Sequence, residues 1–230
     1  PKRDWSSDVY SSDLCIVLLC NQRFFDKMIE TLKGIIYTGY IGDICLVIGD
    51  DLKNSELLKT DFLIQCGVTI KYFPDIKFSE KFDQKFYSLN RPPHWIQKKF
   101  QYHKFYLFDV YFKQWNYIFY VDCGMSVYSS IDPIINCREH NKLLAHSDAY
   151  PSYEWKLRDQ FDQLDDRFSY VNDKYDLNID YPQTTMMLYD TSIINQNTYI
   201  DLIKLNEDVL ISKTNDQGII ALYFTNIRNK

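Results

Sequence analysis

The sequence has few of the residues and runs that mark several common protein classes. Only 7 of its 230 residues are glycine and 7 are proline, which argues against an all-β protein full of tight turns. No apolar run approaches the roughly 20 residues that a membrane-spanning helix needs. The net charge of -5 provides no basic face of the kind that binds nucleic acid. With 46% hydrophobic and 17% aromatic residues, the chain is expected to be globular, with no transmembrane segment and no nucleic-acid partner.

The spacing of the cysteines and the absence of two phosphate-binding motifs argue against further classes of protein. The six cysteines, at positions 15, 20, 45, 66, 123 and 137, include no CxxC pair, so neither a zinc site nor a disulfide framework is expected. Buried free thiols favour a reducing compartment, and we expect a location in the cytoplasm of a microbe or of a virus-infected host cell. The chain has no GxGxxG after its first apolar run and no GxxxxGK[ST], which argues against a dehydrogenase and a P-loop NTPase.

The first fourteen residues do not resemble part of a folded protein. The stretch DWSSDVYSSDL differs only at Tyr10 from DWSSDVCSSDL, the translation in one frame of a common sequencing-adapter oligonucleotide. We therefore expect residues 1–14 to be an artefact in a metagenomic sequence, and residues 15–230 to form one domain. The natural N-terminus is then missing, which leaves an N-terminal signal open.

Apolar runs that alternate with helical patterns predict an α/β fold. Short, wholly apolar runs at 15–20, 44–48 and 117–121 are typical of strands buried on both faces. Stretches at 24–39 and 55–67 have apolar residues at helical spacing. We predict a loop at 75–97 and one long helix at 97–115. The alternation indicates βαβ units, hence a mostly parallel central sheet flanked by helices.

Polar residues follow four of the predicted strands: Asn21, Asp50, Asp122 and Asp148. Ligands of open α/β sheets bind beyond the carboxyl ends of the strands, so these residues are expected along one rim. Asp122 ends a buried strand and is a candidate metal ligand, because Mg²⁺ often needs only one or two carboxylates beside substrate phosphates. The alternative is a carboxylate that caps the next turn.

Five motifs in order resemble the GT-A glycosyltransferases, and within them the glycogenin and lipopolysaccharide galactosyltransferase family. They are Lys104 within a predicted helix, YIFYVDCG at 117–124, DPII at 132–135, TTMMLYD at 184–190 and DQGII at 216–220. The resemblance covers residues 15–224 at low identity. It implies the Rossmann-like GT-A fold and transfer of a sugar from a nucleotide-diphosphate donor, most often a UDP sugar. It implies a glycan, protein or lipid acceptor.

The resemblance also implies where the donor binds. Asn21 and Arg23, after the first strand, match positions near the base. Lys104 matches a basic residue near the ribose or diphosphate, although a solvent-exposed helix face is the alternative reading. Asp122 matches the first aspartate of the DxD motif, which contacts the ribose and the metal.

The remaining matches concern the transferred sugar. Thr184 and Thr185 fall where the family contacts the donor sugar or the acceptor. Asp216 and Gln217 match the pair near the anomeric carbon and are the candidate catalytic residues. The family pattern is that of retaining enzymes, so a retaining, hexosyltransferase-like enzyme is favoured over an inverting one.

Gly124 departs from the family pattern. It replaces the second aspartate of DxD, and the family's C-terminal metal-binding histidine is also missing, since His146 is the last histidine. Either a C-terminal segment has been lost or the diphosphate is held differently. A Mn²⁺ or Mg²⁺ ion on Asp122 alone is one option; neutralisation by Lys98, Lys99, Lys104 or Arg91 is the other. A glycine at 124 also allows close approach of phosphate to the backbone.

Two other functions are open. A GT-A-like module that binds a nucleotide or glycan without catalysis would account for Gly124. A phosphohydrolase is less well supported, because DCGMS is similar to DxDxT only in part and does not lie on the first strand.

Overall fold

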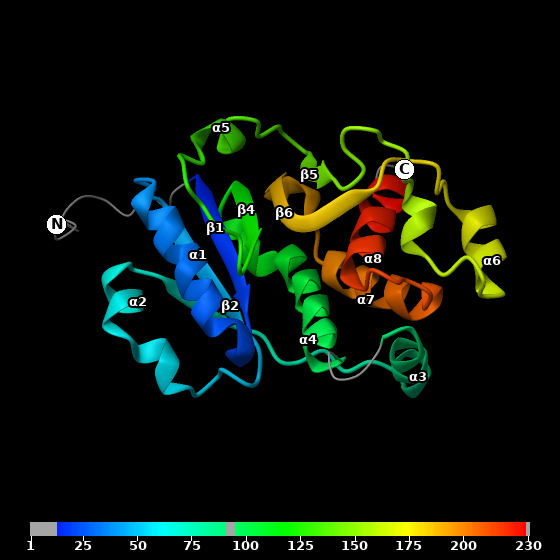
Figure 1. Cartoon of the computed structure of the whole chain (residues 1–230), viewed down its shortest axis with the longest axis horizontal. Coiled ribbons are helices and arrows are strands. Elements are labelled where there is room, and N and C mark those ends of the chain that lie inside the picture. Colours follow the sequence, from blue (N-terminus) through cyan, green and yellow to red (C-terminus); the bar gives the residue numbers. More distant parts are fainter. Residues whose placement is uncertain (1–12, 91–94, 229–230) are drawn as a thin grey trace.

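A mixed sheet lies at the centre of the protein, with helices packed around it (Figure 1). The structure is a computed structural model and describes residues 13–90 and 95–228. Within these residues the strands are β1 (Leu14–Cys20), β2 (Asp43–Ile48), β3 (Thr69–Tyr72), β4 (Tyr117–Asp122), β5 (Leu143–Ser147) and β6 (Pro182–Asp190). Their order in space is β3-β2-β1-β4-β6-β5. The prediction of an α/β fold with a mostly parallel central sheet is confirmed.

Strand direction decides which strand ends meet. β1 is parallel to β2 and β4, and β2 is parallel to β3. β6 is antiparallel to both of its neighbours, β4 and β5. The carboxyl ends of β1–β5 therefore lie at one edge of the sheet together with the amino end of β6. This edge is where ligands of open α/β sheets bind.

Helices of several lengths connect the strands. The α-helices of the described residues are α1 (Phe25–Tyr37), α2 (Asp61–Gln65), α3 (Glu80–Leu89), α4 (Trp95–Phe100), α5 (Asp132–Ile135), α6 (Arg167–Lys174), α7 (Thr198–Val209) and α8 (Asp216–Leu222). The 3₁₀ helices are η1 (Gln22–Phe24), η2 (Glu56–Lys59), η3 (Gln101–Phe108), η4 (Val110–Gln114), η5 (Leu157–Gln160) and η6 (Thr191–Ile193). A π-helical turn, η7 (Tyr223–Ile227), continues α8.

Both faces of the sheet are buried, because successive side chains of a strand point to opposite faces. All seven residues of β1 are buried. Val17 packs in the core that contains residues of η3, α7 and α8, whereas Ile16 and Leu18 pack in the core that contains α1. The continuous apolar run of β1 thus reflects a strand covered by helices on both sides.

The segment predicted as a loop at 75–97 contains a helix, so that prediction was wrong. Ser79 begins α3, and its hydroxyl oxygen accepts a hydrogen bond from the backbone N–H of Phe82 at 3.1 Å. Phe82 and Phe86 lie one turn apart and are both buried. Burial of their large side chains in the core stabilises α3, which the polar, charged sequence of this segment favours only weakly.

The long helix predicted at 97–115 is divided into three pieces, α4, η3 and η4. Asp109 separates the last two with an extended backbone, and its carboxylate accepts a hydrogen bond from the backbone N–H of Tyr111 at 2.8 Å. Local capping therefore replaces one continuous helix by shorter turns.

The predicted artefact at the N-terminus lies largely outside the described residues, which begin at 13. Leu14 is the first residue of β1 and is buried, and the Asp13 carbonyl accepts a hydrogen bond from the N–H of Tyr117 at 2.9 Å. Of the helices at 13–90 and 95–228, none has both the length and the apolar character required to cross a lipid bilayer.

Candidate active site

Four polar side chains from separate segments meet at the carboxyl edge of the sheet. Asp122 is the last residue of β4, and Thr184 lies near the start of β6, which the antiparallel pairing places beside β4. Lys104 lies in η3, and Asp216 is the first residue of α8. We call Lys104, Asp122, Thr184 and Asp216 the lysine cluster.

Lys104 is the centre of this cluster. Its Nζ atom lies 3.0 Å from Asp122 Oδ1 and 3.7 Å from Asp216 Oδ2. It also donates to the Thr184 carbonyl at 3.2 Å. The Thr184 hydroxyl donates to Asp216 Oδ2 at 2.8 Å, and the Tyr120 hydroxyl donates a short hydrogen bond to Asp122 Oδ1. One ammonium group thus holds two carboxylates from distant parts of the chain in fixed positions.

Burial and charge shift the pKa values of the cluster. Lys104, Thr184 and Asp216 are almost fully buried, whereas the Asp122 side chain is 30% exposed. Burial alone would lower the pKa of Lys104, but the charges of Asp216 and Asp122 outweigh it and raise that pKa. Burial raises the pKa of Asp216 to about 6, against the opposing effects of Lys104 and Thr184. At neutral pH the cluster therefore contains a protonated lysine and an Asp216 that is mostly ionised.

Gln217 and Thr185 are neighbours of cluster residues but have different surroundings. The Gln217 side-chain oxygen accepts a hydrogen bond from the backbone N–H of Thr184 at 3.3 Å, so Gln217 contacts the cluster. Thr185 follows Thr184 on β6 and points to the other face of the strand, where its hydroxyl donates to Gln183 Oε1 at 2.9 Å. The structure therefore does not bring the Thr185 side chain to the cluster.

The residues after β1 also differ from each other. Asn21 is buried, and its side-chain oxygen accepts a hydrogen bond from the backbone N–H of Phe24 at 3.2 Å, which caps η1. Arg23 lies in the same short helix but is exposed, and it does not line either cavity described below.

Gly124 faces α1. Its φ of +100° is a left-handed backbone conformation that favours glycine. Its N–H donates to the Thr31 hydroxyl of α1 at 2.9 Å. That amide is therefore engaged inside the protein, and the turn conformation gives a reason for glycine at this position.

Two cavities open beside the cluster along the sheet edge. The first, which we call the Asp122 cavity, has a volume of about 290 Å³ and is lined by Leu19, Asn21, Phe24, Lys98, Phe100, Gln101, Lys104, Tyr120, Asp122 and Cys123. The second, the His103 cavity, has a volume of about 300 Å³ and is lined by Asn21, Asp51, Asp75, Ile76, Lys99, Phe100 and His103. They share Asn21 and Phe100 and therefore adjoin each other, and we call the two together a depression.

The His103 cavity was not predicted. His103 is buried, stacks on Phe100 at 4.2 Å between ring centroids, and has Nε2 3.3 Å from Asp75 Oδ1. Asp75 follows β3 after Phe73 and Pro74, so the polar strand-end signal used for Asp50 and Asp122 could have identified it. Nothing local in the sequence marked His103 or Phe100.

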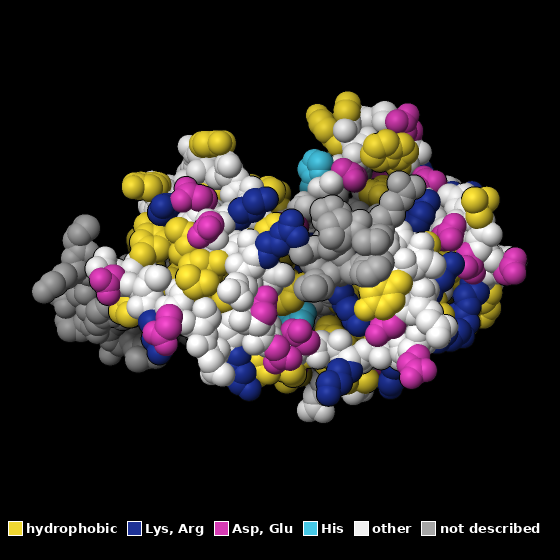
Figure 2. Space-filling model, turned by 60° about the horizontal axis from the view of Figure 1, so that its bottom comes forward, with side chains coloured by type: hydrophobic (Ala, Val, Ile, Leu, Met, Phe, Trp, Pro, Cys, Tyr) yellow, Lys and Arg dark blue, Asp and Glu magenta, His cyan; other side chains and the backbone are white. Residues whose placement is uncertain are grey.

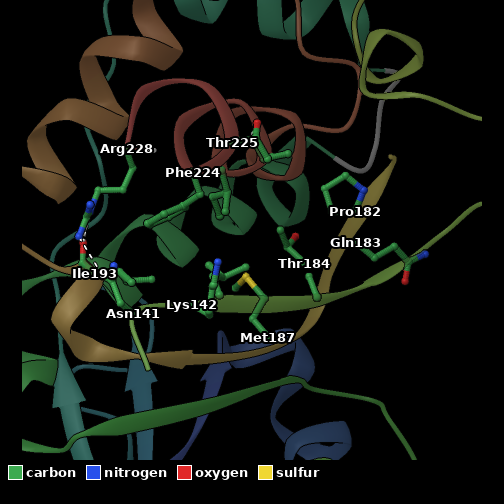
Figure 3. Close-up of a pocket in the computed structure, with 14 residues that line it drawn as sticks. Asn141, Lys142, Pro182, Gln183, Thr184, Met187, Ile193, Phe224, Thr225 and Arg228 are labelled. Carbon is green, nitrogen blue, oxygen red and sulfur yellow. Dashed lines mark hydrogen bonds between the residues drawn. The ribbon is translucent and has the colours of Figure 1, made fainter. Parts of the chain in front are cut away.

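A third cavity, of about 280 Å³, lies between strands β5 and β6 and the helix α8 with its continuation η7 (Figure 3). Its wall includes the apolar side chains of Met187 and Phe224, and Thr184 of the cluster also lines it. Arg228 closes one end by donating from Nη2 to Asn141 Oδ1 at 3.2 Å. We call it the α8 cavity.

The side chains around Asp122 fit a divalent cation poorly. In the part of the chain that the structure describes, no three His, Cys, Asp or Glu side chains are grouped so as to hold a metal ion. Of the residues at 13–90 and 95–228, Asp122 is the one carboxylate that lines its cavity, and both of its oxygens already contact Lys104. On the face shown in Figure 2, basic and acidic side chains are interspersed.

Comparison with known proteins gives a match in structure but not in sequence. No family model matches the chain, and no curated protein is significantly similar to it. The galactosyltransferase LgtC, in complex with donor and acceptor sugar analogues, matches with a TM-score of 0.58 at 12% identity, over 91% of this chain and 70% of LgtC. The chain has the GT-A fold. The fold predicted from the five motifs is thereby confirmed.

Other GT-A glycosyltransferases match similarly. Core-mannan synthase A (CmsA/Ktr4) from Aspergillus fumigatus, in its Mn/GDP form, matches with a TM-score of 0.56 at 10% identity, over 97% of this chain and 72% of that protein. The glycosyltransferase GlyE from Streptococcus pneumoniae matches with a TM-score of 0.54 at 12% identity, over 92% of this chain and 43% of GlyE. At such low identity the likeness concerns the GT-A fold.

Proposed function

We propose that this protein is a glycosyltransferase that moves a sugar from a nucleotide-diphosphate donor to an acceptor hydroxyl. A UDP sugar is the favoured donor. The observation that carries the proposal is the lysine cluster, which lies beside two adjoining cavities at the carboxyl edge of a GT-A sheet. The matched LgtC binds donor and acceptor sugar analogues, and the matched core-mannan synthase binds GDP. These precedents support a nucleotide-sugar donor here.

The donor is assigned to the depression formed by the Asp122 and His103 cavities. Each measures about 300 Å³, so together they have the size of a site for a small organic ligand. The base is assigned to the neighbourhood of Asn21, which lines both cavities, and the ribose and diphosphate to Lys104 and Asp122. Arg23, Gly124 and Thr185 remain candidates from the family resemblance alone.

The chemistry is assigned to Asp216 and Gln217. In the transfer, the bond between the anomeric carbon and the diphosphate oxygen breaks, and the electron pair leaves with the diphosphate. The acceptor oxygen bonds to the same carbon, and its proton passes to the departing diphosphate oxygen. An ionised Asp216 held by Lys104 and Thr184 favours the positive charge that develops on the sugar ring, because the group is fixed before the reaction starts. A solved LgtC variant with an active-site glutamine changed to glutamate is a precedent for Gln217.

The acceptor is assigned to the side of the cluster where Thr184 lines the α8 cavity. A glycan, protein or lipid acceptor would place its hydroxyl near Thr184 and Gln217. We also propose that the sugar keeps its anomeric configuration, as the family resemblance implies. The anomeric proton couplings of the product, measured by NMR, test this directly.

The proposal is tested by incubating the purified protein with a panel of UDP and GDP sugars and measuring released UDP or GDP. One or more donors should be consumed, and Asp216→Asn should slow the reaction by about 100-fold or more, because the variant removes a charge at the reacting carbon. Asp173→Asn is the matched control, since Asp173 is exposed on α6. Nucleotide binding without turnover of any donor would instead identify a non-catalytic GT-A module.

A further inference from the structure

A nucleotide-diphosphate donor, if bound as proposed above, needs positive charge beside its diphosphate. The inference below concerns the groups that supply this charge, and it rests on the proposed function. The family resemblance implies a divalent cation, which protein carboxylates and the diphosphate would hold together. Among the described residues, the Asp122 cavity provides one carboxylate for that purpose, Asp122, and its surroundings differ from those of a metal ligand.

Both oxygens of Asp122 already have partners. Lys104 Nζ lies 3.0 Å from Oδ1 and 3.2 Å from Oδ2, and the Tyr120 hydroxyl donates to Oδ1. A divalent cation bound to this carboxylate would lie close to the ammonium group of Lys104. Two positive centres at that separation repel each other strongly in a partly buried site, where the effective dielectric constant is well below that of water.

The neighbours of Asp122 supply no second ligand. Gly124 has no side chain, and its N–H is bonded to Thr31. The Cys123 thiol donates to the Leu19 carbonyl at 3.0 Å. The set of donors around Asp122 is therefore better suited to a fixed ammonium group than to a metal ion.

The same cavity contains a second lysine. Lys98, in α4, lines the Asp122 cavity together with Lys104. Its neighbour Lys99 is bound to Asp83 at 2.8 Å, whereas Lys98 forms no ion pair with any other residue at 13–90 or 95–228. Lys98 is half-buried and has no acidic partner among the described residues, and the carboxylate of Asp122 in the same cavity is already paired with Lys104. Such a lysine is suited to an anionic ligand.

We propose that Lys98 and Lys104, and no divalent cation, hold the diphosphate of the donor. Lys104 contributes a fixed positive charge beside Asp122. Lys98 contributes a charge that no acidic side chain of the described residues neutralises, so the phosphate oxygens can pair with it. Sugar-nucleotide binding by this protein is accordingly independent of metal.

Calorimetric titration of the whole chain with UDP and with GDP tests this, each in EDTA and in Mn²⁺. The better ligand should bind in EDTA with a dissociation constant within about threefold of that in Mn²⁺, because the ammonium groups already supply the positive charge. Lys98→Gln should weaken binding of that nucleotide by about tenfold or more in EDTA, whereas binding of its nucleoside, uridine or guanosine, should be unchanged. Lys204→Gln, an exposed lysine on α7, is the charge-matched control.

The other possible results would contradict different parts of this inference. Binding that is lost in EDTA and restored by Mn²⁺ would overturn the inference and leave the glycosyltransferase proposal standing. Metal-independent binding that Lys98→Gln does not weaken would overturn the role of Lys98. No binding of UDP or GDP in either condition would overturn both this inference and the proposed donor site. Thermal midpoints of all variants show whether any loss comes from unfolding.

Discussion

Replacing Asp216 by asparagine should change how the stability of this protein depends on pH. Asp216 is almost completely buried, with Oδ2 2.8 Å from the Thr184 hydroxyl and 3.7 Å from Lys104 Nζ. Burial raises its pKa to about 6 in the folded protein. Asparagine has nearly the same shape and still offers an oxygen to Thr184, so the variant removes the titration and little of the packing.

The sign and size follow from the two pKa values. An aspartate in the unfolded chain has a pKa of about 3.9. Between that value and about 6, the folded protein holds a proton that the unfolded chain has released, so the free energy of unfolding falls by about 1.4 kcal/mol per pH unit as pH rises. The stabilisation from this group is complete below about pH 4, is lost as pH rises through about 6, and amounts to about 3 kcal/mol in all.

Urea denaturation of wild type and Asp216→Asn at several pH values provides the assay. Other carboxyls titrate in the opposite direction, because the pKa of Asp75 and that of Asp165 are lowered, so the difference between the two proteins is the useful quantity. Between about pH 4.5 and about pH 7.5, the variant should gain about 2 kcal/mol relative to wild type. Asp173→Asn should show no such gain. A difference that is flat, or that falls with pH, would refute the assignment of a raised pKa to Asp216.

Three further predictions concern backbone and packing. Gly124→Ala should lower the free energy of unfolding by about 1–2 kcal/mol in urea denaturation, because φ is +100° there. Gly49→Ala should cost about 1–3 kcal/mol and also weaken UDP binding in a titration, since an added Cβ would lie 2.8 Å from the Phe100 ring in the wall of both donor cavities. Ser79→Ala should cost about 1 kcal/mol through loss of the cap to the Phe82 N–H, measured by urea denaturation at constant pH; an unchanged midpoint would contradict this role.

Part of the candidate site could be located from the sequence. Asp122 could be placed because it ends a wholly apolar strand, and Lys104, Thr184 and Asp216 because they fall in motifs that occur in the family's order. The structure brings these four side chains into contact. It places Arg23 on the surface and turns Thr185 to the opposite face of β6. A motif match identifies a position along the chain. The direction in which its side chain points depends on the pairing register of the strand, or on the residue at which the helix begins.

Other parts of the site had no local signal. His103 and Phe100 form a wall of the donor depression because α4 and η3 pack against the sheet edge, and their stacking depends on that packing. Similarly, α3 could not be identified from its polar sequence, because Phe82 and Phe86 stabilise it only when they are buried.

The sequence alone determined the α/β class of this protein, because the periodicity of apolar residues reports directly which faces of strands and helices must be buried. It also determined Asp122 as a strand-end carboxylate, since an apolar run of strand length ends there. Only the tertiary structure decided that Lys104, from a different segment, occupies the space between Asp122 and Asp216. The reversed direction of β6 decided that Thr184 joins them. Such contacts depend on strand order and direction, and therefore on the packing of the whole chain, which no local pattern of residues encodes.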